Sequence, residues 1–80
     1  MKTPYERGWQ QGYWTPERLR IALFRSAQAC LDNAERRYEE ELEKALGWTD
    51  QDAAAKHRDY MTGMITRTRQ DLAALIKAGY

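Results

Sequence analysis

The sequence contains few of the residues that build disulfide-bonded or metal-stabilised proteins. Its 80 residues include one cysteine and one histidine. A disulfide scaffold needs paired cysteines, and a structural zinc site needs about four convergent cysteine or histidine ligands. The composition therefore argues against both classes, and we expect no metal and no other cofactor.

Valine is absent, and the longest uninterrupted apolar run, over 72–76, has only five residues. A helix that spans a bilayer needs about 20 apolar residues, and the first seven residues lack the apolar stretch of a signal peptide. The formal net charge of +1 provides no overall attraction to nucleic acid or to a membrane. These absences favour a cytoplasmic protein with no membrane partner.

Glycine and proline are also scarce, and their positions divide the chain into segments 1–14, 15–47 and 48–80. In the middle segment, Thr15 and Pro16 are typical of a helix start, and no glycine or proline follows until Gly47. Apolar residues recur at steps of three and four. We therefore predict a helix up to Leu46, ended by a left-handed Gly47.

The third segment repeats this arrangement. Thr49 is the expected N-cap, and the apolar pattern continues to Ala78, where Gly79 is the expected left-handed residue after the helix. A short connection between two long helices favours an antiparallel helical hairpin. Within it, the small residues Ala27 and Gly63 are expected to let the helices approach closely.

The first segment has a helix-start signature of its own. Thr3 is a suitable cap, with Pro4 in the first helical position and Glu6 two residues later. A short helix over about 4–13 would place Tyr5, Trp9 and Tyr13 on one face.

The fold class is therefore predicted to be all-α, with residues 1–80 forming a single helical domain. Two helices cannot enclose both of their apolar stripes. Either the N-terminal segment covers the remainder, or a second copy does so by forming a four-helix bundle. We expect a homodimer of this kind.

Four of the nine aromatic residues lie in the first 14 positions. They suit a lid over the hairpin, a protein-binding patch, or a stacking surface for single-stranded nucleic acid. An acidic block near the end of the middle helix suits a basic partner surface. The candidate partner-binding residues are Tyr5, Trp9, Tyr13, Trp14, Arg18, Glu39, Glu40 and Glu43. For nucleic acid, the candidates are Arg7, Arg18, Arg20 and Arg25.

No catalytic constellation is recognisable, and Cys30 and His57 are expected to be packing residues. We expect a non-enzymatic module that modulates or inhibits a larger protein or complex by stoichiometric association. Small inhibitors encoded by phages and plasmids have this size and simplicity. The alternative is a nucleic-acid-associated accessory protein that uses the basic and aromatic N-terminal surface.

Overall fold

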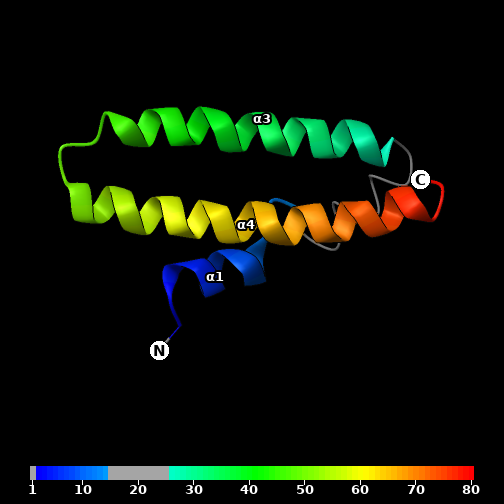
Figure 1. Cartoon of the computed structure of the whole chain (residues 1–80), viewed down its shortest axis with the longest axis horizontal. Helices are drawn as coiled ribbons and strands as arrows, with labels where there is room; N and C mark the ends of the chain where they lie inside the picture. The colour runs from blue at the N-terminus through cyan, green and yellow to red at the C-terminus, as the bar shows by residue number, and fades with distance from the viewer. Residues whose placement is uncertain (1, 15–25) are drawn as a thin grey trace.

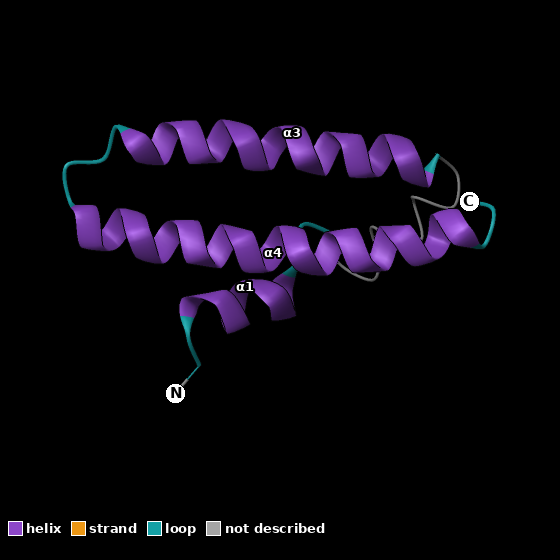
Figure 2. Ribbon diagram, viewed as in Figure 1, coloured by secondary structure: helices purple, strands orange, loops and turns teal. Residues whose placement is uncertain are grey.

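The computed structural model describes residues 2–14 and 26–80, and across them it is all-helical with no strand (Figure 2). The helices are α1 (Pro4–Gln11), α3 (Ala27–Leu46) and α4 (Gln51–Lys77). This confirms the predicted fold class. Among these helices, none combines the length and apolar character needed to cross a membrane.

Helix α4 is the central element of the fold. Helix α3 lies along one side of it, joined to it at one end by residues 47–50, and α1 packs on its other side (Figure 1). The chain ends close to the start of α3, where the backbone N–H of Ala27 donates to the carbonyl of Tyr80 at 3.0 Å. Since α4 contacts both other helices, it supplies the largest fully buried side chains, which are Ile65, Leu72 and Thr68.

Local capping signals account for several of the helix ends. The Thr3 side chain accepts from the backbone N–H of Glu6, as predicted. Gly79 has φ 97°, which confirms a left-handed residue after α4. Two expectations about the helix ends are wrong. Asp50, and not Thr49, caps α4 by accepting from Ala53 at 3.0 Å, and Gly47 has a right-handed φ of −85°.

The prediction of one unbroken helix up to Leu46 is wrong at Ser26. This residue is extended, with φ −62° and ψ 127°, and its hydroxyl accepts from the backbone N–H of Ala29 as the N-cap of α3. A serine hydroxyl offers the backbone this alternative to a continuing helix. The expected helix start at Thr15 and Pro16 lies outside the described residues.

The core between α3 and α4 combines small residues from α3 with large ones from α4. One cluster contains Ala27, Cys30 and Leu72, and the other contains Ala34 and Ile65. All are buried, so the small α3 side chains bring its backbone close to the long side chains of α4. Ala27 therefore packs on Leu72 at this contact, whereas Gly63, also expected to let α3 and α4 approach closely, faces α1.

Gly63 instead forms the contact between α4 and α1, opposite Gly8. A Cβ atom at Gly63 would lie 2.7 Å from the backbone nitrogen of Trp9. One at Gly8 would lie 2.8 Å from the carbonyl carbon of Tyr60. Real Cβ atoms do not approach backbone so closely, so the two helices touch through their main chains. Helix α1 thus buries its glycine face and leaves Tyr5 and Trp9 partly exposed.

The segment after α1 is tied to α4 by a buried hydrogen bond. The backbone N–H of Tyr13 donates to Oγ1 of Thr68 at 2.8 Å, and Thr68 is buried. This bond satisfies a main-chain donor that solvent does not reach.

We predict that Thr68→Val destabilises the protein by about 1–3 kcal/mol, because valine keeps the shape but leaves that donor unpaired. Urea unfolding followed by circular dichroism measures the change. Thr66→Val is the matched control, since the Thr66 hydroxyl only donates back to the Thr62 carbonyl within α4. Equal losses in both variants would contradict a special role for the Tyr13–Thr68 bond.

Candidate functional site

The outer face of α1 carries two of the large exposed aromatic side chains. Tyr5 is 40% exposed and Trp9 is 37% exposed. Together with Glu6 and Gln10 they line a pocket of about 260 Å³. Tyr5 and Trp9 are one helical turn apart, so both rings project from the same side of α1. We call this surface the α1 aromatic face.

The Trp9 ring and carbonyl both contact α4 through Arg67. The Arg67 guanidinium lies 4.7 Å from the centre of the Trp9 ring, and Arg67 Nη1 donates to the Trp9 carbonyl at 3.3 Å. Arg67 is itself held by Asp71, with Nε and Oδ2 3.0 Å apart. A cation stacked on an indole ring is attracted by the ring's negative face. Arg67 therefore restricts Trp9 from the α4 side while the ring remains partly open to solvent.

The other two N-terminal aromatics do not join this face. Tyr13 is only 7% exposed and packs with Ala34 and Ile65, and Trp14 is half-buried against both core clusters. The four aromatic residues, which the sequence suited to a lid, a protein-binding patch or a stacking surface, are therefore divided. Tyr5 and Trp9 belong to the surface, whereas Tyr13 and Trp14 contribute to the core.

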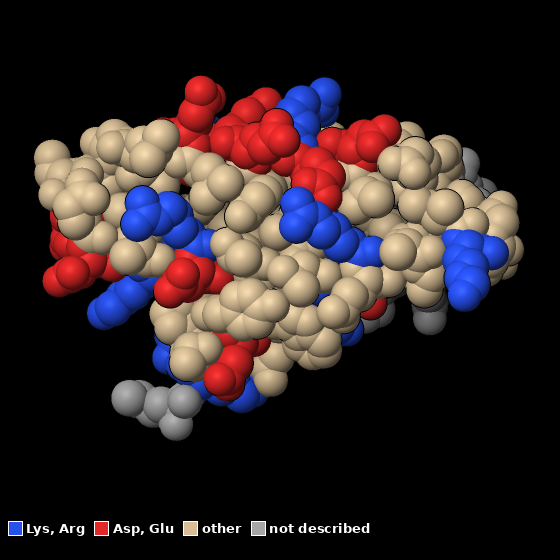
Figure 3. Space-filling view, viewed as in Figure 1, with Lys and Arg blue, Asp and Glu red and all other residues tan. Residues whose placement is uncertain are grey.

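The predicted acidic patch lies elsewhere. Glu39, Glu40 and Glu43 are exposed on α3, and Figure 3 shows acidic side chains along the α3 side of the molecule. Because α3 and α1 lie on opposite sides of α4, the acidic patch and the α1 aromatic face do not form one surface (Figure 1). Also at the surface, Arg69 of α4 donates to Glu35 of α3 at 2.7 Å, and this hydrogen bond lowers the pKa of the Glu35 carboxyl.

The basic residues proposed for nucleic acid are only partly placed. Arg7 is exposed on α1. The other three candidates, Arg18, Arg20 and Arg25, lie outside the described residues. Their expected position near the aromatic residues therefore stays a prediction.

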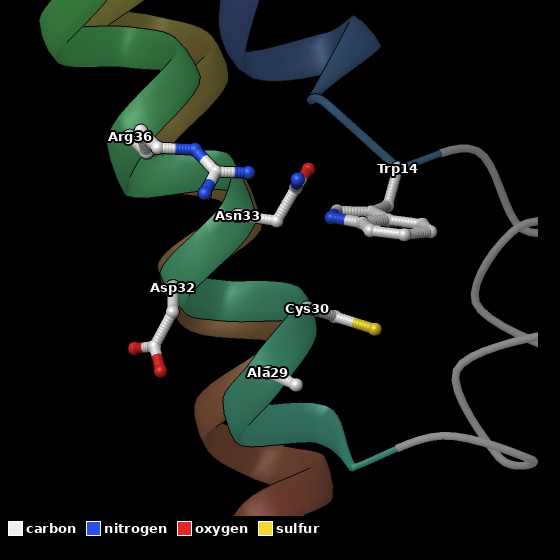
Figure 4. Close-up of a pocket in the computed structure, with 6 residues that line it drawn as sticks. All are labelled: Trp14, Ala29, Cys30, Asp32, Asn33 and Arg36. Carbon is white, nitrogen blue, oxygen red and sulfur yellow. The ribbon is translucent and has the colours of Figure 1, made fainter.

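A pocket of about 390 Å³ lies beside Trp14 (Figure 4). Its indole faces α3, which contributes Cys30, Asn33 and Arg36 to the lining. Cys30 is a buried free thiol that packs with Ala27 and Leu72. His57 has different neighbours, so the described contacts do not pair Cys30 with a histidine.

A smaller pocket, of about 180 Å³, involves residues from three parts of the chain. Tyr13 comes from the segment after α1, and α3 and α4 supply the rest. We call it the Tyr13 pocket. Its lining comprises Tyr13, Arg37, Glu41, His57, Tyr60, Met61 and Met64.

The polar side chains of the Tyr13 pocket are already partly engaged. The Arg37 guanidinium lies 5.4 Å from the centre of the Tyr13 ring. His57 Nε2 is 3.6 Å from Glu41 Oε2, and the His57 ring stacks on Trp48 with centroids 4.7 Å apart. Arg37 was not among the residues expected to have a role, and Glu41 was considered only as part of the acidic block near the end of the middle helix. The i, i+4 spacing of Arg37 and Glu41 places both on one face of the helix, and this spacing was the feature of the sequence that could have indicated a shared site.

Burial raises the pKa of the Tyr13 hydroxyl from 10.0 to about 12, against the opposing effect of the Arg37 guanidinium. Between those two pH values the unfolded chain loses this proton while the folded protein keeps it. The stability from this group is thus present below pH 10 and is lost as pH rises to about 12.

We predict a fall of roughly 2–3 kcal/mol over this interval that is missing from Tyr13→Phe. Urea unfolding at a series of alkaline pH values measures it in both proteins. Tyr5→Phe serves as the control, since Tyr5 lies on the surface. Identical pH profiles for wild type and Tyr13→Phe would contradict the burial of this hydroxyl.

Within residues 2–14 and 26–80, no three histidine, cysteine, aspartate or glutamate side chains form a cluster suited to a metal ion. Comparison of the chain with protein families, with curated proteins and with solved structures finds no match in any of the three.

Proposed function

We propose that this protein is a non-enzymatic binding module that modulates a larger protein by associating with it through the α1 aromatic face. The observation that carries the proposal is the partial exposure of Tyr5 and Trp9 on α1, a helix whose backbone packs directly against the backbone of α4. Tryptophan and tyrosine are enriched among the residues that dominate interface binding energy.

The attachment of α1 favours this use of its outer face. The Gly8–Gly63 crossing holds the helix main chain against α4, and Arg67 holds the Trp9 ring. A partner therefore meets side chains that are already ordered, so less conformational entropy is lost on binding. The partner surface that fits is an apolar recess able to take an indole ring. The acidic residues, Glu39, Glu40 and Glu43, would contact a second, separate site on the partner.

Capture from a native lysate with tagged full-length protein tests the proposal. A partner retained by wild type and by His57→Gln, but lost with folded Trp9→Ala, supports it. Retention of the same partner by Trp9→Ala refutes the assignment to the α1 aromatic face. Retention of nucleic acid that falls steeply with salt would instead favour the alternative based on Arg7, Arg18, Arg20 and Arg25.

We also propose that α3 and α4 form an antiparallel hairpin that pairs with a second copy as a four-helix bundle. The support is apolar surface outside the α1 aromatic face: Leu46 is 72% exposed, and Trp48 and Tyr80 are also exposed. Small domains bury a modest fraction of their surface alone.

Sedimentation equilibrium is expected to give twice the 9.4 kDa chain mass at micromolar concentration. Leu46→Glu is expected to shift the protein toward the monomer, because it places a charge in the apolar contact. Gln51→Glu is the control, since it adds a charge at a nearby exposed position. A wild-type mass of 9.4 kDa across that range would refute the dimer.

A further inference from the structure

We propose that a second copy of the chain packs on one defined face of α3 and α4, so that the α3 of each copy lies over the α4 of the other. This inference rests on the proposed dimer and adds its interface and its symmetry: a two-fold axis parallel to the helices. We call this surface the Tyr38 face. It is defined by four residues that join α3 to α4, namely Glu35, Tyr38, Thr62 and Arg69.

Contacts between side chains of the two helices mark the Tyr38 face. The hydroxyl oxygens of Tyr38 and Thr62 are 3.1 Å apart. Arg69 donates to Glu35 at 2.7 Å, and its guanidinium lies 5.8 Å from the centre of the Tyr38 ring. These contacts place the four residues on one side of the groove between α3 and α4.

Apolar side chains extend the Tyr38 face along α3. Leu31 lies one helical turn before Glu35, and Leu42 lies one turn after Tyr38. Leu46, a further turn on, is 72% exposed. Burial of this stripe against a second copy supplies the hydrophobic driving force for association.

The size of the molecule suits an interface of this kind. The molecule measures 43 × 27 × 18 Å, and α3 and α4 lie side by side across its broad side (Figure 1). A stable interface buries about 800 Å² on each partner. A broad side of these dimensions is large enough to provide that area.

Charge selects which helices face each other. On the Tyr38 face α3 carries Glu35 and, one turn later, Glu39, whereas α4 carries Arg69 and Arg58, one turn before Thr62. Along the middle of the view in Figure 3, acidic side chains gather over α3 and basic side chains lie over α4. If α3 lay over the partner's α3, acidic groups would face acidic groups, and like charges across an interface are strongly unfavourable. With α3 over the partner's α4, acidic groups face basic ones.

The two-fold axis also fixes the register of the dimer. Rotation about an axis parallel to the helices moves no residue along that axis. Glu35 and Arg69 are level within one chain, because they pair there, and they are therefore level across the interface as well. The four side chains, two from each copy, then alternate in sign around the axis. Charged groups placed in this way specify register and orientation more than they add stability.

Mixing wild type with a charge-swapped variant tests the arrangement. Glu35→Arg combined with Arg69→Glu keeps the ion pair within the chain and the net charge, so the variant is expected to form homodimers. In a mixed dimer, each swapped charge would lie over a like charge. Random pairing makes about half of the dimers mixed, and we expect a mixed fraction at least about fivefold lower. Native mass spectrometry of an equal mixture after exchange measures it.

The matched control is Arg36→Glu combined with Glu40→Arg, which swaps two exposed charges outside the Tyr38 face. It is expected to mix with wild type at the random level. A mixed fraction at or above that level for the Glu35 and Arg69 swap would overturn the inference while leaving the dimer in place. A monomeric wild type in sedimentation equilibrium would refute the proposed dimer itself, and this arrangement with it.

Disulfide crosslinking provides a test that does not depend on the swapped variant folding. Two chains with Cys30→Ala each receive one new cysteine, Leu42→Cys in one and Arg58→Cys in the other, and are mixed and oxidised. The contact between Tyr38 and Thr62 places positions 42 and 58, each one turn away, at the same level. Disulfides that join unlike chains are therefore expected. Disulfides that join two Leu42→Cys chains would show α3 on α3 and overturn the inference.

Discussion

Gly63→Ala is expected to displace α1 from α4 and to destabilise the protein by about 1–2 kcal/mol or more. Alanine favours a helix over glycine by about 1 kcal/mol, which acts in the opposite direction. The new Cβ, however, would meet the backbone of α1, including the Trp9 nitrogen at 2.7 Å. A backbone atom cannot rotate away as a side chain can, and overpacking of this kind commonly costs about 1–3 kcal/mol or more. Steric conflict therefore outweighs helix propensity.

The measurement is urea unfolding, with hydrogen exchange to locate the loss. Exchange is expected to accelerate in α1 before it does so in α4. Gly8→Ala should act in the same way, because its Cβ would meet the Tyr60 carbonyl group. Gly47→Ala is the matched control: it has a right-handed φ, and the nearest atom to its added Cβ is the Lys44 oxygen at 3.5 Å. A neutral or stabilising Gly63→Ala would show that the helices do not touch through their backbones.

Trp9→Ala is expected to weaken binding to the captured partner by roughly 30- to 1000-fold. Truncation of a central interfacial tryptophan commonly costs on the order of 2–4 kcal/mol. Tyr5→Ala is expected to act in the same direction. Tyr13 and Trp14 belong to the core, so their truncation is expected to lower stability as well as binding. Isothermal titration with the purified partner measures each affinity.

His57→Gln is the comparison variant, because the contacts of His57 are with Glu41 and Trp48 and it does not line the pocket of the α1 aromatic face. It should bind the partner with nearly wild-type affinity. Both variants must first melt normally, since Trp9 also packs on Arg67. If His57→Gln abolishes binding while Trp9→Ala has no effect, the aromatic anchor hypothesis is wrong, and His57 must take part directly.

Local sequence patterns were sufficient to predict the helical class and several helix ends. Thr3 caps α1 and Gly79 follows α4 in a left-handed conformation, as predicted. Each depends on hydrogen bonds and backbone preferences within a few residues, so the nearby sequence is sufficient to predict it. At Ser26 the same local information was ambiguous, because a serine can continue a helix or cap a new one.

The face of α1 that is buried depends on how α1 packs against α4, which the sequence of α1 does not specify. The sequence displayed an aromatic face with Tyr5 and Trp9 and, beside it, glycines at positions 8 and 12. The glycine face is buried, since Gly63 on α4 offers a matching gap and the two backbones can then touch. The Tyr13 pocket is likewise invisible in any single segment. Tyr13, Arg37 and His57 meet because α4 packs against both α3 and the N-terminal segment, and contacts between distant segments depend on packing that local sequence patterns do not encode.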